Sequence, residues 1–168
     1  MNRDNYWEEL LNEHGSALLL YARQWSNSIA DAEDIVQKSF VRFWRSEYTR
    51  SENPAPYLYR IVRNTAIDLI RSRKRREIRE RQVFEESDKA PMFEPGLEQE
   101  ERHKEIEKAI AKLPEEQREV VVMKIWGDLT FKEIAETLGI PQNTAASRYR
   151  YALDALGRQL GDNHFYEL

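Results

Sequence analysis

Apolar side chains recur along most of the chain at the three- and four-residue spacing of amphipathic helices. No stretch shows the convincing alternation of apolar and polar residues that a strand would give. The first pattern predicts a helix from Asn5 to Trp25, with one apolar stripe that contains Trp7, Leu10, Leu11, Leu18, Tyr21 and Trp25. The pattern as a whole predicts an all-α fold.

Two further helices are expected in the first half of the chain. Asp31 suits the N-cap of the second helix, whose apolar stripe is formed by Ile35, Val36, Phe40, Phe43 and Trp44. The polar segment 45–56 then breaks the pattern at two prolines. A third helix is expected from near Pro56; it continues into the basic run RSRKRREIRERQ and buries Leu58, Ile61, Val62, Ile67 and Ile70.

The segment 129–153, LTFKEIAETLGIPQNTAASRYRYAL, has the layout of a helix-turn-helix. Thr130 and Glu133 have the spacing of a capping box, Gly139 suits the left-handed end of that helix, and Pro141 suits the first turn of the next helix. The second helix has an inner stripe of Ala145, Tyr149, Ala152, Leu153 and Leu156, and an outer face of Asn143, Ala146, Ser147, Arg150 and Tyr151. Short polar side chains near a helix N-terminus suit a DNA groove. A small helical bundle with a solvated polar face is the alternative.

The charge of the chain is divided unevenly. The formal net charge is −4, yet residues 60–81 carry nine basic and three acidic side chains, and residues 84–101 carry seven acidic side chains and one lysine. Prolines and acids in the second of these segments are typical of a linker. We therefore expect a helical domain at 1–84, an acidic linker at 85–101 and a second helical domain at 102–168.

Several kinds of chemistry are not expected. The chain has no cysteine, its three histidines lie far apart, and no glycine-rich phosphate loop is present. We expect no enzyme active site, no metal and no cofactor. The N-terminus lacks the apolar core of a signal peptide, and the apolar patch ALLLYA is far shorter than the roughly 20 residues of a membrane span. These features predict a soluble cytoplasmic protein without a membrane partner.

Two long stretches resemble one family. DAEDIVQKSFVRFW, followed by PYLYRIVRNTAIDLIRSRKRR, resembles region 2 of bacterial sigma factors of the extracytoplasmic-function (ECF) group. LPEEQREVVVMKIWGDLTFKEIAETLGIPQNTAASRYRYAL resembles region 4 of the same group. The two stretches cover most of the chain in the order of the family. The region 2 motifs are specific, whereas region 4 alone is shared with many regulators.

The resemblance implies the function and the partners. It implies a factor that binds core RNA polymerase, recognises the −10 and −35 promoter elements and promotes DNA opening, without catalysis of its own. The partners would be the clamp helices of the largest polymerase subunit, the flap of the second subunit, and promoter DNA. An anti-sigma protein is a further partner that the resemblance allows. The resemblance also implies that core polymerase docks on Glu33, Asp34, Gln37 and Lys38.

The third helix is expected to bind the −10 region. Aromatic and arginine side chains together suit unpaired DNA, which points to Tyr57, Tyr59, Arg60, Arg63 and Asn64. In the family, the asparagine that matches Asn64 and the preceding loop capture an extruded base. The basic run is expected to follow duplex phosphates through Arg71, Arg73, Lys74, Arg75 and Arg76. Packed tyrosines and a solvated basic helix end are the alternatives.

The last helix is expected to read the −35 element with Asn143, Thr144, Ala146, Ser147, Arg148, Arg150 and Tyr151. The chain departs from the usual pattern here, with Asn143, Ala145 and Ala146 where a glycine, a branched apolar residue and a basic residue are common. Tyr57 stands where tryptophan is frequent. The −35 sequence therefore does not transfer from relatives. A stand-alone helix-turn-helix regulator and a helical adaptor without nucleic acid are the alternatives, and the region 2 motifs favour the sigma factor.

Limited proteolysis tests the expected linker. Its acids and prolines bury too little apolar surface to offset the entropy of ordering, so protease should first cut the free chain between Glu85 and Glu101. Mass spectrometry of the early fragments identifies the cut. Initial cleavage within 1–84 or 102–168, with 85–101 protected, would contradict two domains joined by a tether.

Overall fold

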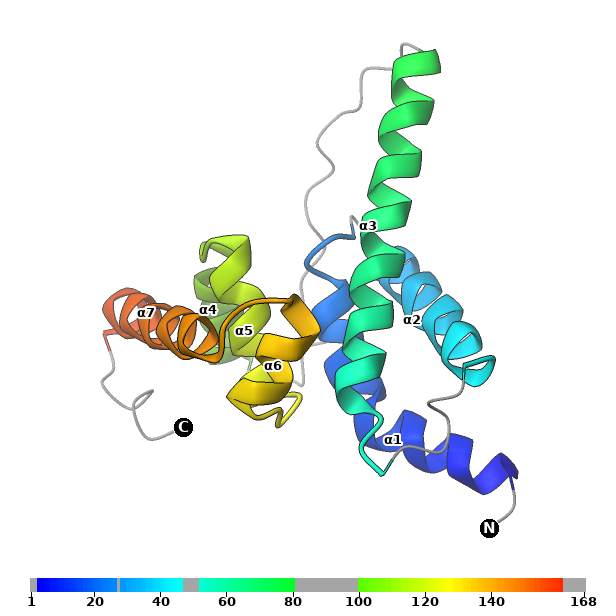
Figure 1. Cartoon of the computed structure of the whole chain (residues 1–168). Helices are drawn as coiled ribbons and strands as arrows, with labels where there is room; N and C mark the ends of the chain where they lie inside the picture. The colour runs from blue at the N-terminus through cyan, green and yellow to red at the C-terminus, as the bar shows by residue number, and fades with distance from the viewer. Residues whose placement is uncertain (1–2, 27, 47–51, 81–99, 162–168) are drawn as a thin grey trace. The chain divides into compact units, whose positions relative to one another are not determined.

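The computed structural model describes residues 3–26, 28–46, 52–80 and 100–161, and all regular secondary structure in these ranges is α-helical (Figure 1). The expected all-α fold is confirmed. The chain divides into two compact units, Met1–Ala90 and Pro91–Leu168. The expected linker lies outside the described residues, apart from its last two, where a helix begins. Within the described ranges, no helix is long and apolar enough to cross a membrane.

Unit 1 consists of α1 (Arg3–Ala22), α2 (Ile29–Trp44) and α3 (Ala55–Glu80), and each helix packs against the other two. Its largest fully buried side chains are Leu18, Tyr21, Ile35, Phe43, Leu58, Tyr59 and Val62. The first helix ends before Trp25, which packs edge-on against Tyr21 with 4.8 Å between ring centroids. Phe40 and Trp44 are half-buried beside Trp7, so the centre of the buried face of α2 lies elsewhere, at Ile35 and Phe43.

Ser28 caps the N-terminus of α2, and the prediction that Asp31 does so is wrong. Ser28 has extended backbone angles, φ −149° and ψ 162°, and its hydroxyl accepts a hydrogen bond of 3.1 Å from the backbone N–H of Asp31. This is the usual bond from the N-cap to the third helical residue. The helix begins three residues earlier than expected, and the carboxylate of Asp31 is available for a contact outside the cap.

Helix α3 runs without interruption for 26 residues and continues into the basic run, as predicted. It begins after Pro54, where the amide oxygen of Asn53 accepts a hydrogen bond of 3.3 Å from the N–H of Ala55. Its last turns extend past the ends of α1 and α2 (Figure 1). Ile67 and Ile70 are half-buried rather than buried, because the core of unit 1 thins out where α3 leaves it.

Tyr59 belongs to the core, and its expected role in DNA binding is wrong. The side chain is 0% exposed and lies 5.0 Å from the ring of Tyr21. Its hydroxyl is buried without a hydrogen-bond partner among the described residues, and burial raises its pKa. Tyr59 shares its helix face with Val62 and Ala66, three and seven residues further on, and both are fully buried. A ring in this position cannot stack on a base.

Unit 2 consists of α4 (Glu100–Ala111), α5 (Glu115–Ile125), α6 (Phe131–Leu138) and α7 (Gln142–Leu160). Helix α7 packs against the other three helices. The core gathers Ile110 from α4, Val120 to Met123 from α5, Ile134 from α6 and Leu156 from α7. The inner stripe predicted for α7 is confirmed, since Ala145, Tyr149, Ala152, Leu153 and Leu156 are all buried.

The turn between α6 and α7 follows the predicted residues closely. The hydroxyl of Thr130 accepts a bond of 3.2 Å from the N–H of Glu133, and the carboxylate of Glu133 accepts one of 2.8 Å from the N–H of Thr130. Gly139 ends α6 in the left-handed region at φ 66°. Pro141 is the N-cap of α7, one residue before the expected first turn. The capping box and the glycine turn are confirmed.

The buried hydroxyl of Tyr59 yields a prediction about stability. An unsatisfied buried hydroxyl costs about 1–3 kcal/mol, so Tyr59→Phe should raise the free energy of unfolding by about 1 kcal/mol. Urea unfolding followed by circular dichroism measures this change. A clear loss of stability in Tyr59→Phe would show that the hydroxyl is hydrogen-bonded.

Candidate functional site

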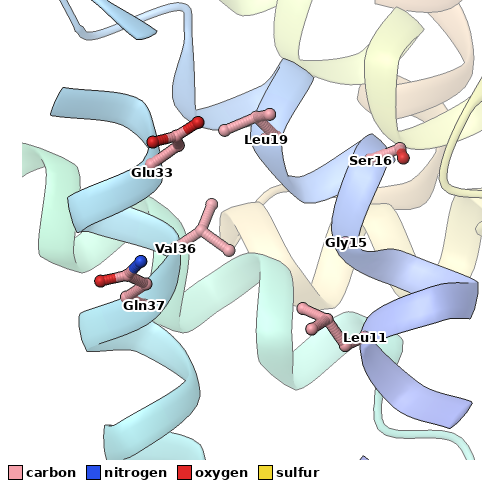
Figure 2. A pocket seen from close by; sticks show the side chains of 7 residues that line it. All are labelled: Leu11, Gly15, Ser16, Leu19, Glu33, Val36 and Gln37. Atoms are coloured by element: carbon pink, nitrogen blue, oxygen red, sulfur yellow. The ribbon is translucent and has the colours of Figure 1, made fainter. Parts of the chain in front are cut away.

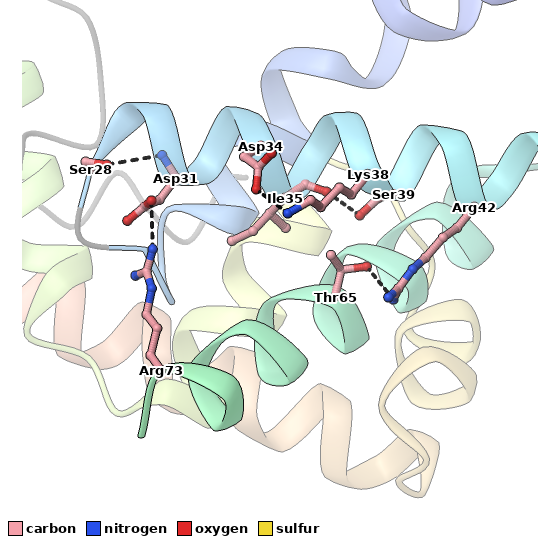
Figure 3. Close-up of polar contacts among 9 residues, drawn as sticks. All are labelled: Ser28, Asp31, Asp34, Ile35, Lys38, Ser39, Arg42, Thr65 and Arg73. Carbon is pink, nitrogen blue, oxygen red and sulfur yellow. Dashed lines mark hydrogen bonds and ion pairs between the residues drawn. The ribbon is translucent and has the colours of Figure 1, made fainter. Parts of the chain in front are cut away.

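The four predicted docking residues form two strips on the exposed side of α2. Asp34 and Lys38 form one strip, joined by an ion pair of 2.7 Å between Oδ2 and Nζ (Figure 3). Glu33 and Gln37 form the other, one helical position away, and both are exposed. The strips differ in their surroundings, since Glu33 and Gln37 border a groove and Asp34 and Lys38 bond to each other.

The groove between α1 and α2 has a volume of about 290 Å³ (Figure 2). Its lining comprises Leu11, Gly15, Ser16, Leu19, Glu33, Val36 and Gln37. Leu11 is 53% exposed, so its expected place in the core is wrong. The side chains of Leu11 and Val36 face the groove from opposite helices (Figure 2).

Gly15 helps to keep this groove open. A Cβ atom at this position would lie 3.3 Å from Cδ1 of Leu11, which is a close contact. The sequence did not predict the groove, because Leu11 was placed in the apolar stripe of this helix together with Leu10 and Leu18. The signal that could have revealed it is the glycine between Leu11 and Leu19, at the same four-residue spacing.

One face of α3 carries much of the predicted DNA-binding set. Tyr57, Arg60, Asn64, Arg71 and Arg75 are separated by three, four, seven and four residues, so they return to the same side of the helix over five turns, about 27 Å. We call these five residues the α3 stripe. Tyr57 is half-buried beside Phe43, at 6.0 Å between ring centroids, and the other four are exposed. Arg63 is half-buried at the edge of the stripe.

The basic run of α3 is divided between two sides of the helix. Arg73 lies opposite the α3 stripe, and its Nη2 is 2.7 Å from Oδ1 of Asp31 on α2 (Figure 3). Lys74, Arg75 and Arg76 are exposed. A polar groove at this end is lined by Ser72, Arg75, Arg76, Arg79 and Glu80. Arg79 was not predicted as a site residue, although it follows Arg75 at the four-residue spacing.

Arg42 is a further residue that sequence reasoning missed. It lies on α2, and its Nη1 donates a hydrogen bond of 3.0 Å to Oγ1 of Thr65 (Figure 3). The same nitrogen approaches Oδ2 of Asp68 at 3.6 Å. Thr65 is the next residue after Asn64, and Asp68 lies one helical turn after Asn64. The side chain of Arg42 is 52% exposed. An arginine therefore joins α2 to α3 next to the predicted base-capturing residue.

The outer face of α7 is mixed in exposure and charge. Asn143, Arg150 and Tyr151 are exposed, whereas Thr144, Ala146, Ser147 and Arg148 are half-buried. The guanidinium of Arg150 lies 5.2 Å from the ring centroid of Tyr151. Arg148 forms an ion pair of 3.4 Å with Glu116 on α5 and is only 24% exposed. The cations of this helix thus differ, with Arg148 held against its own unit and Arg150 open to solvent.

Family comparisons match both units. Residues 10–76 match the family described as Sigma-70 region 2, and residues 103–156 match Sigma-70, region 4. These are regions of the subunits with which bacterial RNA polymerase initiates transcription at promoters. The chain is therefore of the sigma-70 class.

Whole-chain relatives narrow the class. The chain is 32% identical over 149 residues to the ECF RNA polymerase sigma factor SigE of Mycolicibacterium smegmatis, which covers 84% of this chain and 56% of that protein. It is 32% identical to RpoE of Cereibacter sphaeroides, with 80% and 76% covered, and 30% identical to SigL of Mycobacterium tuberculosis H37Rv, with 88% and 84% covered. The chain belongs to the family of ECF RNA polymerase sigma factors, and its function is transcription initiation.

Solved structures share the fold. RpoE of Bartonella quintana, in complex with the anti-sigma factor NepR, superimposes with a TM-score of 0.76 at 24% identity, covering 95% of this chain and 98% of that one. CnrH, in complex with the cytosolic domain of CnrY, superimposes with a TM-score of 0.59 at 24% identity, with 96% and 91% covered.

Proposed function

We propose that this chain binds core RNA polymerase through α2, recognises the −10 element with α3 and the −35 element with α7, and helps to open the promoter without catalysis of its own. The α3 stripe is the observation that carries the proposal. It places one aromatic ring, one amide and three guanidinium groups along a single face, which suits a strand that passes from unpaired bases to duplex phosphates. A stand-alone regulator has no need of such a face.

Docking on the clamp helices of the largest polymerase subunit would use both strips of α2. Glu33 and Gln37 would bond across the rim of the groove, while an apolar partner side chain fills the space between Leu11 and Val36. Removing this apolar surface from water would supply most of the affinity. The Asp34–Lys38 pair would supply specificity. On docking, each of the two side chains would give up its ion pair with the other and pair with an oppositely charged group of polymerase.

Strand capture would centre on Asn64. This residue is exposed between Arg60 and Arg71 on the α3 stripe, so a strand whose phosphates lie on the arginines presents its bases to the amide. Extruding a base costs a few kcal/mol, and Tyr57 offers a ring against which that base could stack. Tyr57 is half-buried, so its ring is held by the protein before DNA arrives.

The second unit would read the −35 element through weak contacts. Ala146 suits the methyl group of thymine, while Ser147, Arg150 and Tyr151 would reach base edges or phosphates. Arg148 contributes less, because Glu116 already holds it. Core polymerase, with the flap of its second subunit on unit 2, would hold both units at once. Unit 2 then meets the −35 element at high effective concentration, so the few cations of α7 suffice for DNA binding. The proposal includes residues 85–101 as the tether between domains 1–84 and 102–168.

The proposal has two further parts. RNA polymerase works in the bacterial cytoplasm, so we place the chain there. We also propose an anti-sigma protein as a regulating partner, which would cover the groove of unit 1 and thereby compete with polymerase. Two proteins of the same fold are seen bound to an anti-sigma protein, NepR, and to the cytosolic domain of CnrY, and this supports the suggestion.

Core binding should depend on the exposed side of α2. Asp34→Ala combined with Gln37→Ala removes one residue from each strip and should weaken binding to core polymerase at least about tenfold, the loss of roughly 1.4 kcal/mol. Glu105→Ala with Lys108→Ala, exposed at the same spacing on α4, is the matched control. Fluorescence anisotropy of labelled chain measures binding, and circular dichroism checks the helices. Unchanged binding by the folded double variant would remove α2 as the docking site.

Promoter opening should depend on Asn64. Wild-type chain with core polymerase should start transcripts at a defined position, whereas Asn64→Ala should lose more activity on duplex DNA than on a template already mismatched across the −10 element. The mismatch removes part of the unpairing cost. Ile78→Ala, at an exposed position beyond the stripe, is the control. Equal losses on both templates would argue against strand capture, and no transcripts with wild-type chain would reject the proposed function.

A further inference from the structure

Arg73 differs from the other basic residues at the end of α3. Its guanidinium is 2.7 Å from the carboxylate of Asp31, and the two side chains are only 31% and 29% exposed. A short, partly shielded bond between full charges is stronger than a solvated surface pair. Arg73 also faces away from the α3 stripe, because it is two residues from Arg71 and from Arg75 and each step turns the chain by about 100°.

A second polar tie joins the same two helices further along. Arg42 on α2 bonds to Thr65 and lies 3.6 Å from Asp68 on α3. Asp31 lies in the first turn of α2 and Arg42 in its last turn. Their partners on α3, Arg73 and Thr65, are eight residues apart, which is about two turns. One tie between two helices leaves their crossing angle free. Two separated ties, added to the apolar contact that sets the rotation of α3, fix the crossing angle as well.

We propose that Arg73 is a positioning residue for promoter binding and not a phosphate ligand. With Asp31, it holds the projecting turns of α3 so that Arg71 and Arg75 face the DNA duplex. The inference rests on the proposed function and assigns a role within it. Because Asp31 belongs to the polymerase-docking helix, the same ion pair transmits the orientation of docked α2 to the basic end of α3.

If Arg73 were a phosphate ligand, removal of Asp31 would have the opposite effect on DNA binding. If Arg73 bound a phosphate, Asp31 would merely compete for it, and removal of the carboxylate would free a cation and tighten DNA binding. If Arg73 positions the helix, loss of either partner weakens binding, and loss of both weakens it no further. The sign of the effect of Asp31→Asn therefore separates the two roles.

The experiment uses full-length chain assembled with core polymerase at saturating chain concentration. Its probe is a fluorescent promoter fragment chosen from those that the wild-type holoenzyme transcribes. We expect Asp31→Asn and Arg73→Gln each to weaken binding about two- to fivefold, the scale of a partly exposed ion pair, and the double variant to match either single one. Arg75→Gln is the matched control for a phosphate contact. It should reduce the steepness of the fall in log affinity with log salt by about 0.9. Arg73→Gln and Asp31→Asn should change that steepness equally, because each acts only through Arg71 and Arg75.

A measurement on the free chain tests the same tie without DNA. In Asp31→Asn, amide hydrogen exchange should speed up over residues 74–80 and stay unchanged over 57–64, because only the projecting turns lose a support. Tighter promoter binding by Asp31→Asn, additive effects in the double variant, or opposite changes in salt dependence for Arg73→Gln and Asp31→Asn would overturn the inference. A wild-type holoenzyme that binds no promoter would instead reject the proposed function, and the inference with it.

Discussion

Leu58, Tyr59, Val62 and Ala66 pack from one side of α3 into the core of unit 1, and this contact fixes the rotation of the helix about its axis. Because α-helices repeat every 3.6 residues, the same rotation decides the direction of every side chain as far as Glu80. The outward direction gathers the α3 stripe, and the inward direction gives Arg73 to Asp31. Apolar packing within the first turns of α3 thus organises polar groups that lie several turns away.

Helix α2 is the structural partner on which this arrangement depends. It contacts α1 and α3 on different sides and leaves a third side open. Its charged residues serve different neighbours: Asp31 and Arg42 bond to α3, Asp34 and Lys38 bond to each other, and Glu33 borders the groove. The proposed surfaces for polymerase and for DNA therefore lie on adjacent helices of a small unit and are held in fixed relation.

Local sequence rules predicted the features that depend on near neighbours. The capping box of Thr130 and Glu133, the left-handed Gly139 and the inner stripe of α7 all follow from spacing along the chain, and the structure shows each of them. The all-α fold follows in the same way from the apolar repeat. The family motifs pointed to the residues of α2 and α3 as a set, and four of the five in the α3 stripe are exposed.

The errors arose where the partner is distant in sequence. Tyr59 has the composition of a base-stacking residue, but its position relative to Val62 places it in the core. Leu11 is apolar, but α1 and α2 diverge beside Gly15 and leave it exposed. The cap of α2 is an exception, because Ser28, which caps the helix, lies only three residues before Asp31. Arg73 forms an ion pair with a carboxylate 42 positions earlier, which no local pattern in a run of arginines could have revealed.

The uninterrupted path of α3 limits how this chain can change in length. A single residue inserted between Asn64 and Arg71 would turn all later side chains by about 100°, so Arg71 and Arg75 would leave the side of Asn64 and Arg73 would lose Asp31. Insertions or deletions of about seven residues, two full turns, nearly restore the direction but move the basic end by about 10 Å along the axis. Related chains should therefore keep the interval from Asn64 to Arg75 constant.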